Sequence, residues 1–473
     1  MQSEILELAK KLRSGETTAK QLLGEAYKTI EAKEPTVNAF INLMKNQAEK
    51  QAEEIDKRLT NGEELPLLAG IPCAIKDMIC VADAKTTAGS KMLENFIPPY
   101  DAEVITRLKN NGAVFVGKAN MDEFAMGSST EFSIVGPTHN PLNHKLVAGG
   151  SSGGSVAAVA SGMVPYALGT DTGGSIREPA SFCGIVGFKP TYGRISRSGV
   201  ISYASSFDQV GPLARTVEDT ALVYEAIAGP DPKDSTTLLG TMSSVLTTMH
   251  GGVKGLRIGV PKEFFNEGVD KEVVTTVKKA IDKLQQNGAI VSEVSLALTD
   301  VALAVYLILT RAEASTNLAR YDGVRFGLRS DGKTMEEIYR KTRGAGFGVE
   351  VKQRIMLGTF ALSSGYADKY YKQASAVRRE IAQEYAGTFE QVDVLVGPAT
   401  PEVAFPIGSK TDNPLRMYAA DVLTVPVNVA GVPAIVVPCG KAHEMPVGLQ
   451  IISAQGREDL CFRVASTVEA FDD

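Results

Sequence analysis

Two glycine-rich loops that carry serines are the part of this sequence best suited to chemistry. The first covers residues 149–155 (GGSSGGS), and the second begins 20 positions later and covers residues 169–177 (GTDTGGSIR). Glycine lets the backbone approach a ligand closely, and the exposed N–H groups of such loops can bind an anion, including an oxyanion that develops during a reaction. A serine on a rigid turn of this kind is suited to nucleophilic attack. The two loops therefore predict a serine nucleophile.

A serine nucleophile needs a base, and Lys76 is the candidate. The short apolar run of residues 72–75 ends directly at this lysine, so its side chain is expected at the end of a buried strand. To accept a proton the lysine has to be neutral. Lowering its pKa from ~10.4 to ~7 requires roughly 4 kcal/mol of differential stabilisation from burial and neighbours. The alternative is a solvated lysine that pairs with the adjacent Asp77.

A second mechanism starts from the same loop. Residues 150–154 match the G-x-S-x-G nucleophile elbow of α/β-hydrolases, which would make Ser152 the nucleophile. That mechanism needs a histidine later in the chain, and His250 and His443 are available. Neither lies in a glycine-rich or otherwise distinctive loop, so this mechanism ranks second.

Three further features are interpreted as structural. Cys183 lies in an apolar stretch without an adjacent base, which favours a buried, unreactive thiol. Asp171 and Arg177 flank Ser175 and are expected to fix the loop through an ion pair. Residues 112–118 (GAVFVGK) fit the first seven positions of a phosphate-binding loop, but their middle reads as a strand and the next residue lacks the hydroxyl that would hold magnesium.

Composition narrows the class of protein. The chain has 473 residues, with 49 Lys and Arg against 55 Asp and Glu, and its net charge of -6 argues against a broad nucleic-acid-binding surface. No apolar run reaches the ~18 residues of a membrane span, and the N-terminus does not read as a signal peptide. The five cysteines are scattered, and the four histidines lack metal-ligand spacing. We expect a cytoplasmic protein without a metal site.

The elements that position these residues alternate along the chain. Helical spacing of apolar residues predicts helices from Ile5 to a stop at Gly15, over residues 46–59 and over residues 271–286, and a capping box at residues 18–21 opens another. Short apolar runs predict strands at residues 72–75, 113–116, 164–168, 256–260, 392–396, 435–437 and 447–451. This alternation indicates an α/β fold with a mostly parallel sheet covered by helices. In such folds chemistry gathers at the carboxyl ends of strands.

Four stretches taken together resemble the amidase signature family. They are residues 70–77, 149–155, 169–180 and 184–191. The combined pattern is far more specific than the elbow or the phosphate-loop pattern. It implies a large central twisted mixed, mostly parallel β-sheet flanked by helices on both faces, and we expect one domain over residues 1–473 with a mostly helical region at about 298–386.

The resemblance also implies a Ser-cisSer-Lys triad. Ser175 would be the nucleophile, Ser151 the bridging serine beside a cis peptide bond, and Lys76 the base. Ser175 would attack an amide carbonyl while its proton passes through Ser151 to Lys76, ammonia would leave, and the acyl-enzyme would then be hydrolysed. The family's oxyanion hole would be formed by the N–H groups of Thr172, Gly173 and Gly174.

Three further stretches, residues 118–131, 317–327 and 418–428, are similar to one group within this family, the glutaminase subunits of tRNA-dependent amidotransferases. The similarity implies a glutamine site in which Arg354 binds the α-carboxylate and Asp421 the α-ammonium. Tyr306 and Ser128 would line the pocket. These charges suit a free amino acid, which presents one anion and one cation.

The similarity implies partners as well. Ammonia would pass to a large tRNA-binding subunit that activates Glu-tRNA(Gln) or Asp-tRNA(Asn) with ATP and magnesium. A small third subunit would complete a heterotrimer. This chain would carry no cofactor of its own and would meet tRNA mainly through the partner. The similarity also leads us to expect a C-terminal tail somewhat longer than the one in this sequence. Two alternatives stay open: a stand-alone amidase acting on small or aryl amides, and a non-catalytic scaffold on the same fold.

Overall fold

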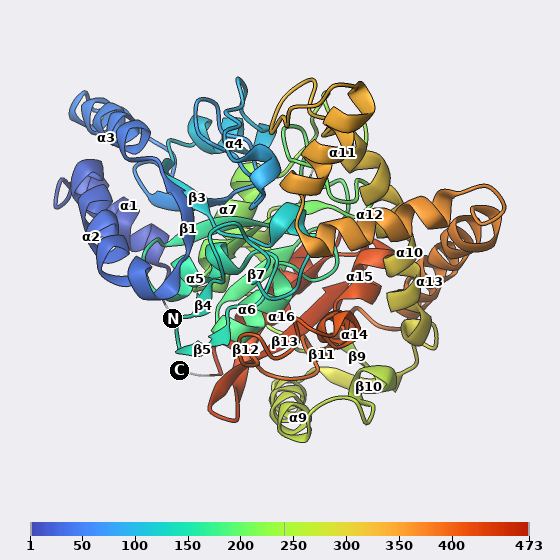
Figure 1. The fold of residues 1–473 in the computed structure, drawn as a ribbon. Coiled ribbons are helices and arrows are strands. Elements are labelled where there is room, and N and C mark those ends of the chain that lie inside the picture. The colour runs from blue at the N-terminus through green and yellow to red at the C-terminus, as the bar shows by residue number, and fades with distance from the viewer. Residues whose placement is uncertain (1, 241, 472–473) are drawn as a thin grey trace.

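The computed structural model describes residues 2–240 and 242–471, and its centre is an 11-stranded β-sheet (Figure 1). The strand order is β1-β3-β2-β6-β8-β7-β12-β13-β11-β9-β10, and a separate two-stranded sheet pairs β4 with β5. The strands are β1 (Phe40–Leu43), β2 (Pro72–Lys76), β3 (Val114–Ala119), β4 (His139–Asn140), β5 (Asn143–Val147), β6 (Tyr166–Asp171), β7 (Val186–Lys189), β8 (Gln209–Ala214), β9 (Arg257–Pro261), β10 (Ile290–Val294), β11 (Val394–Pro398), β12 (Ala434–Ala442) and β13 (Met445–Ser453).

Helices cover both faces of this sheet. They bury every residue of strands β2, β3, β6, β8, β11 and β13. The helices are α1 (Glu4–Ser14), α2 (Ala19–Val37), α3 (Lys45–Thr60), α4 (Glu103–Asn110), α5 (Gly153–Ala160), α6 (Arg177–Cys183), α7 (Val217–Ile227), α8 (Val245–Thr248), α9 (Lys271–Gln286), α10 (Thr299–Asn317), α11 (Met335–Gly346), α12 (Val349–Leu362), α13 (Gln373–Gln391), α14 (Pro414–Tyr418), α15 (Val425–Ala430) and α16 (Glu458–Glu469). The expected α/β architecture is confirmed.

The sheet is mixed. Strand β2 runs parallel to β3 and β6, and β9 runs parallel to β10 and β11. The other neighbouring pairs are antiparallel, among them the β12–β13 hairpin. Antiparallel pairing is thus more extensive than the alternation of elements indicated, because a short turn such as the one after Ala442 can only join antiparallel strands.

Local sequence signals explain where several helices begin and end. Helix α1 ends at Gly15, which adopts the left-handed conformation that glycine tolerates, and α2 opens with a capping box in which Thr18 and Gln21 exchange side-chain and backbone hydrogen bonds. Helix α9 begins after Asp270, whose carboxylate accepts the N–H groups of Glu272 and Val273. These three helices agree with the sequence predictions.

Lys76 and the second serine loop lie side by side because β2 and β6, the third and fourth strands in the sheet order, are parallel neighbours. Lys76 is the last residue of β2, and β6 ends at Asp171, four residues before Ser175. Helix α5 begins directly after Ser152 and packs against both strands, while α6 begins directly after the second loop and contacts α5. The sheet therefore places Lys76 and the second loop at the same end of two adjacent strands. The N–H of Ser152 donates to the carbonyl of Ser175, which joins the first loop to the second.

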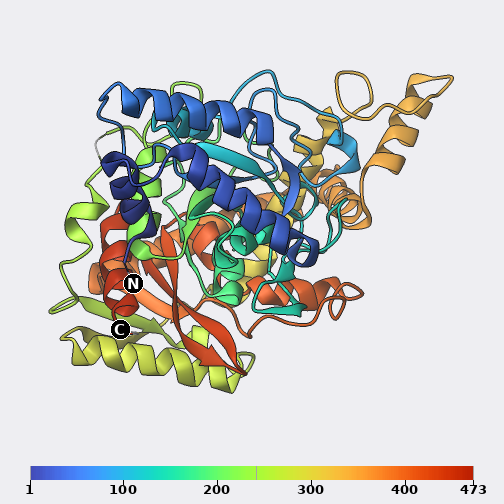
Figure 2. The ribbon, with the colours of Figure 1, turned by 90° about the vertical axis from the view of Figure 1, so that its left-hand side faces the viewer.

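Other helices pack on the strands of the sheet: α3 contacts β3, α7 contacts β8, and both α9 and α16 contact β12. Figure 2 shows the blue helices α1–α3 and the yellow-green helix α9 on opposite sides of the molecule. Helices α10–α13 span residues 299–391 and form the lobe at the right of Figure 1, where α10 packs on α12, α13 and α15. In residues 2–240 and 242–471, none of the helices has the length and apolar character needed to cross a bilayer.

Candidate active site

Lys76 is completely buried and surrounded by hydroxyl groups. Its Nζ atom lies 2.8 Å from the Oγ of Ser151, 2.8 Å from the Oγ of Ser152 and 2.8 Å from the Oγ1 of Thr170. The alternative in which Lys76 pairs with Asp77 is wrong. The Asp77 carboxylate instead accepts hydrogen bonds from Thr87 and lies 3.7 Å from the Nζ of Lys118.

Burial sets the charge state of Lys76. Removal from water lowers the pKa of the ammonium from 10.5 to about 7, and the charges of Asp122, Asp171 and Asp208 oppose part of that shift. A neutral amine keeps a lone pair, and a hydroxyl can donate a hydrogen bond to it as readily as it accepts one from the ammonium. The surroundings of Lys76 therefore suit both of its protonation states.

The serines occupy different layers of the site. Ser151 and Ser152 are fully buried, whereas Ser175 keeps 8% of its surface exposed. The backbone carbonyl of Ser175 accepts the N–H of Ser152 at 3.2 Å, and the Ser175 hydroxyl makes no hydrogen bond within the described part of the chain. The peptide bond between Gly150 and Ser151 is cis. Ser175 is thus the most exposed of the three serines, while Ser151 and Ser152 lie deeper, beside Lys76.

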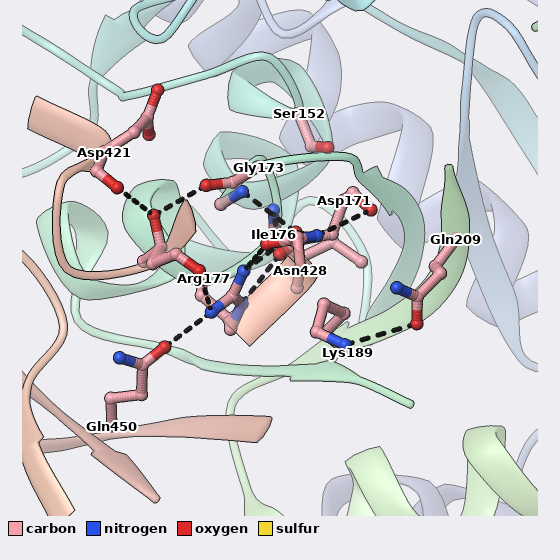
Figure 3. Close-up of polar contacts among 12 residues, drawn as sticks. Ser152, Asp171, Gly173, Ile176, Arg177, Lys189, Gln209, Asp421, Asn428 and Gln450 are labelled. Atoms are coloured by element: carbon pink, nitrogen blue, oxygen red, sulfur yellow. Dashed lines mark hydrogen bonds and ion pairs between the residues drawn. The ribbon is translucent and has the colours of Figure 1, made fainter. Parts of the chain in front are cut away.

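An ion pair fixes the loop that carries Ser175 (Figure 3). The Arg177 guanidinium lies 2.9 Å from Asp171 through Nε and 3.0 Å through Nη2, and it also bonds to Asn428 and Gln450. Burial raises the pKa of Asp171, but the Arg177 charge and hydrogen bonds outweigh that effect and lower it to about 2. The expected structural role of this pair agrees with the geometry.

Asp171 also shapes the backbone of the loop. Its carboxylate accepts the N–H of Gly174 at 2.9 Å and that of Ile176 at 3.3 Å. Gly173, the residue before Gly174, has no room for a side chain, because a Cβ atom there would lie 2.6 Å from the ring of Tyr306. The loop is therefore pressed against Tyr306, one of the residues expected to line the pocket.

The residues expected to bind a substrate gather beside this loop. The Asp421 carboxylate accepts a hydrogen bond from the Ser128 hydroxyl, and burial raises its pKa to about 7 while the charge of Arg354 lowers it in part. The pKa of Tyr306 is raised chiefly by burial, and it too feels the charges of Arg354 and Asp421. The structure thus brings these four residues into one neighbourhood.

Arg354 is held by residues that the sequence did not single out. Its Nε donates to Glu350 at 2.7 Å and its Nη1 donates to the hydroxyl of Tyr203 at 2.8 Å. The guanidinium also faces the ring of Tyr418, 5.5 Å from its centroid. Its Nη2 group makes no hydrogen bond within residues 2–240 and 242–471, so one arm of the fork remains available to a ligand.

Comparison with known proteins identifies the family. The sequence profile described as Amidase matches residues 21–462. The chain belongs to the amidase signature family. A relative from Geobacillus kaustophilus, named as the A subunit of glutamyl-tRNA(Gln) amidotransferase, is 52% identical over 470 residues, which cover 99% of this chain and 97% of that protein. A protein of the same name from Halalkalibacterium halodurans is 53% identical over 464 residues, covering 98% of this chain and 96% of the relative.

Solved structures of this family share the fold. The A subunit of glutamyl-tRNA(Gln) amidotransferase from Thermotoga maritima is 40% identical, with a TM-score of 0.80 over 95% of this chain and 91% of that chain. The peptide amidase of Stenotrophomonas maltophilia is 29% identical, with a TM-score of 0.85 over 99% of this chain and 97% of that chain. The mixed sheet and its helices are therefore those of an amidase signature enzyme.

The rival features of the sequence lie outside the serine cluster. In the described part of the chain, His443 contacts Asp270 and His250 contacts Ser466, and neither histidine contacts Ser152, so the structure does not favour the nucleophile elbow. Burial raises the pKa of the Cys183 thiol, which agrees with an unreactive cysteine. Residues 114–119 form strand β3, so the phosphate-loop pattern is a strand, as expected.

Several members of the site were missed from the sequence. Thr170 lies within the second serine loop, but only the strand geometry shows that its hydroxyl reaches Lys76. Glu350 stands four residues before Arg354 on a helix, a spacing that could have indicated the pair. Tyr203 lies in a loop far from Arg354 in sequence and gives no such signal. In the described residues, no group of three or more His, Cys, Asp or Glu side chains is arranged to hold a metal ion.

Proposed function

We propose that this chain is the glutaminase subunit of a tRNA-dependent amidotransferase. It would hydrolyse glutamine to glutamate and ammonia, and a partner subunit would use the ammonia to convert Glu-tRNA(Gln), or Asp-tRNA(Asn), to the amidated product. Relatives named as the A subunit of glutamyl-tRNA(Gln) amidotransferase support this proposal, because they are 52–53% identical over nearly their whole length. The structural observation that carries it is the presence of a buried Arg354 and a half-buried Asp421 beside the Ser175 loop.

This pair fits the charges of a free amino acid. The unbonded Nη2 of Arg354 can donate to an α-carboxylate, while the Asp421 carboxylate can accept from an α-ammonium. Tyr306, which feels both charges and touches Gly173, would form the wall between them and the reacting bond. A simple or aryl amide carries neither charge and would offer no anion to the Nη2 of Arg354 and no cation to the Asp421 carboxylate.

The chemistry follows from the contacts of Lys76. With Lys76 neutral, the Oγ of Ser175 attacks the side-chain carboxamide carbon of glutamine while its proton passes to Ser151 and the proton of Ser151 passes to Lys76 Nζ. The tetrahedral intermediate collapses as a proton returns to the leaving nitrogen, and ammonia departs. A water molecule then attacks the glutamyl ester on Ser175 through the same relay, which releases glutamate and restores the enzyme.

Backbone N–H groups of the second loop would stabilise the oxyanion of each tetrahedral intermediate. The candidates are those of Thr172, Gly173 and Gly174. The N–H of Gly174 already donates to Asp171 at 2.9 Å, so its share in binding the oxyanion would be smaller than that of the other two.

We also propose that the partner subunit uses ATP and magnesium and that a small third subunit completes a heterotrimer. The net charge of -6 fits a division of labour in which the partner holds most of the tRNA. This assembly can be tested by recovering the tagged chain from its native host and identifying the proteins that copurify. Stoichiometric recovery of two further subunits, one large and ATP-using and one small, is expected, whereas recovery of the chain alone would favour a free-standing amidase.

The substrate assignment is tested by replacing Arg354 with Met. Loss of a buried, charge-assisted contact costs about 2–5 kcal/mol, so the KM for glutamine should rise by at least about 30-fold. Arg311→Met is the matched control, because Arg311 is also buried and stacks on the Tyr418 ring but donates to the carbonyl of Leu307. An unchanged KM for glutamine in the Arg354 variant would contradict the assignment. Hydrolysis of an uncharged aryl amide, measured in parallel, should not distinguish the two variants.

A further inference from the structure

The buried carboxyl group of Glu178 stands directly behind the Ser151 loop. Glu178 is the second residue of α6 and is completely buried. Its Oε2 accepts the N–H of Gly150 at 2.9 Å, and Gly150 is the residue joined to Ser151. Its Oε1 is buried without any hydrogen-bond partner among the described residues. A side chain that is half bonded and wholly buried at this position calls for a functional explanation.

The contact is close as well as buried. A Cβ atom on Gly149 would lie 2.4 Å from the Oε2 of Glu178, so the first serine loop fits against this carboxyl only because it begins with glycine. On its other side the loop faces Asp122, whose Oδ2 would lie 2.3 Å from a Cβ atom on Gly150. The backbone that leads into Ser151 is therefore held between two acidic side chains.

The charged groups around Glu178 are mostly negative. Asp421 and Asp122 face it, and the cation that acts on it, Lys410, is already paired with Glu402. An ionised Glu178 would place a third negative charge in this region, with one oxygen uncompensated. A buried charge in that situation costs several kcal/mol, whereas a neutral carboxylic acid still offers its carbonyl oxygen to the N–H of Gly150.

We propose that Glu178 is a positioning residue that works as a neutral acid, holding the Gly150 backbone so that Ser151 stays within reach of Lys76. This inference rests on the proposed function, because it assumes that Ser151 relays the proton of Ser175. Glu178 touches neither the substrate nor the reacting atoms. Its neutrality leaves Asp421 as the anion that binds the substrate ammonium. Burial, followed by the charge of Asp421, raises the pKa of Glu178 well above its usual value, which is consistent with this role.

Glutamine keeps the shape and the carbonyl acceptor of a neutral glutamate but cannot ionise, so Glu178→Gln is the informative variant. Glu178→Ala removes the acceptor. Cys183→Ala is the matched control on the same helix, because it truncates another buried side chain, whose Sγ donates to the carbonyl of Ala148. The readout is the rate at which a phosphonofluoridate reagent modifies Ser175 in the full chain, identified by mass spectrometry. This rate reports the serine relay without assuming that glutamine is the substrate.

We expect Glu178→Gln and Cys183→Ala to react within about threefold of the wild-type rate at pH 7. Glu178→Ala should react about 10-fold to 100-fold more slowly, the range expected when a buried hydrogen-bond partner is removed. The ratio of the Glu178→Gln rate to the wild-type rate should rise once the pH is high enough to ionise the wild-type carboxyl. Thermal unfolding of each variant separates these effects from loss of the fold.

If the wild type reacts at Ser175, two results would overturn the inference about Glu178 and leave the proposed nucleophile standing. One is a Glu178→Gln variant as slow as Glu178→Ala, which would mean that the ionised form is required. The other is a folded Glu178→Ala variant as fast as wild type, which would mean that the contact with Gly150 positions nothing. A wild-type chain that the reagent does not modify at Ser175 would overturn the proposed nucleophile and this inference together. If Glu178→Ala does not fold, the Glu178→Gln rate and its pH dependence still decide.

Discussion

The pH dependence of glutamine hydrolysis tests the role of Lys76 most directly. Lys76 must be neutral to accept a proton, and burial lowers its pKa to about 7. The neutral fraction of such a group is about one tenth at pH 6 and about nine tenths at pH 8. We therefore expect kcat to rise by about 10-fold between these two pH values and then to level off. An unperturbed lysine, with a pKa of ~10.4, would instead keep kcat rising about tenfold per pH unit up to pH 10.

The assay is release of ammonia at saturating glutamine from pH 5.5 to pH 9.5, with the chain in complex with the subunits that copurify with it. Saturation matters because Asp421 also titrates near pH 7 and should affect KM rather than kcat. Lys189→Met is the control: Lys189 is equally buried and its pKa is also about 7, yet its Nζ contacts Pro190, Gln209 and Val432 rather than the serines. Its loss should leave the midpoint unchanged. A flat profile, or a rise that continues beyond pH 9, would refute the reasoning.

The same pKa shift has a consequence for stability. Between about pH 7 and pH 10.5 the unfolded chain keeps a proton on Lys76 that the folded chain has released, so the free energy of unfolding rises with pH in this window. A shift from 10.5 to about 7 corresponds to about 5 kcal/mol in all. Lys76→Met should abolish this part of the slope in urea denaturation, together with hydrolysis. A slope unchanged from wild type would show that Lys76 is charged in the folded protein.

Three further substitutions test other contacts of the site. Asp421→Asn should raise the KM for glutamine by about 30-fold or more. The wild-type KM should rise below pH 7 as this carboxyl is protonated, and a pH-independent KM in the wild type would contradict its role. Arg177→Met should lower the free energy of unfolding by about 3–5 kcal/mol, because it leaves Asp171 buried without its cation. A loss below about 1 kcal/mol, measured by urea denaturation, would argue against this account. Gly173→Ala should lower kcat by about 10-fold or more with little change in urea stability, because its Cβ would displace the Tyr306 ring from the pocket, and a normal kcat would show that the loop can yield.

Sequence reasoning predicted those parts of the fold that depend on local pattern. The apolar run before Lys76 became β2, and residues 271–286 became α9 with the bounds expected from helical spacing. Strand partners were harder to predict, because the order of strands depends on contacts between distant segments. Strand β12, for example, pairs with β7, almost 250 residues earlier. The extent of antiparallel pairing could not be read from the alternation of elements.

For the site, the sequence was informative where residues stand in dense, unusual loops and uninformative where a single side chain acts alone. Ser151 and Ser175 stood out because their neighbours are glycines. Arg354 was found through the family resemblance, but its support by Tyr203 joins two segments about 150 positions apart and depends wholly on tertiary structure. Glu178 follows Arg177 within residues 169–180, one of the stretches that carry the family resemblance. Nothing in its sequence neighbours indicates that its carboxyl faces the backbone of Gly150.

The three most deeply buried lysines show why contacts, rather than burial, identify a base. Lys76, Lys118 and Lys189 are all fully buried, and burial lowers the pKa of each. Lys118 donates to the Ile79 carbonyl and to one hydroxyl, that of Thr86, and has a carboxylate 3.7 Å away. Lys189 donates to oxygens of carbonyl and carboxamide groups, which can accept but cannot donate. Those neighbours favour an ammonium. Lys76 faces three hydroxyls at 2.8 Å. Those of Ser152 and Thr170 donate to the Thr170 carbonyl and the Met78 sulfur, whereas that of Ser151 donates to no other group in the described residues and can donate to a neutral amine. Of these lysines, Lys76 alone contacts a hydroxyl that donates to no other described group and can pass a proton in both directions.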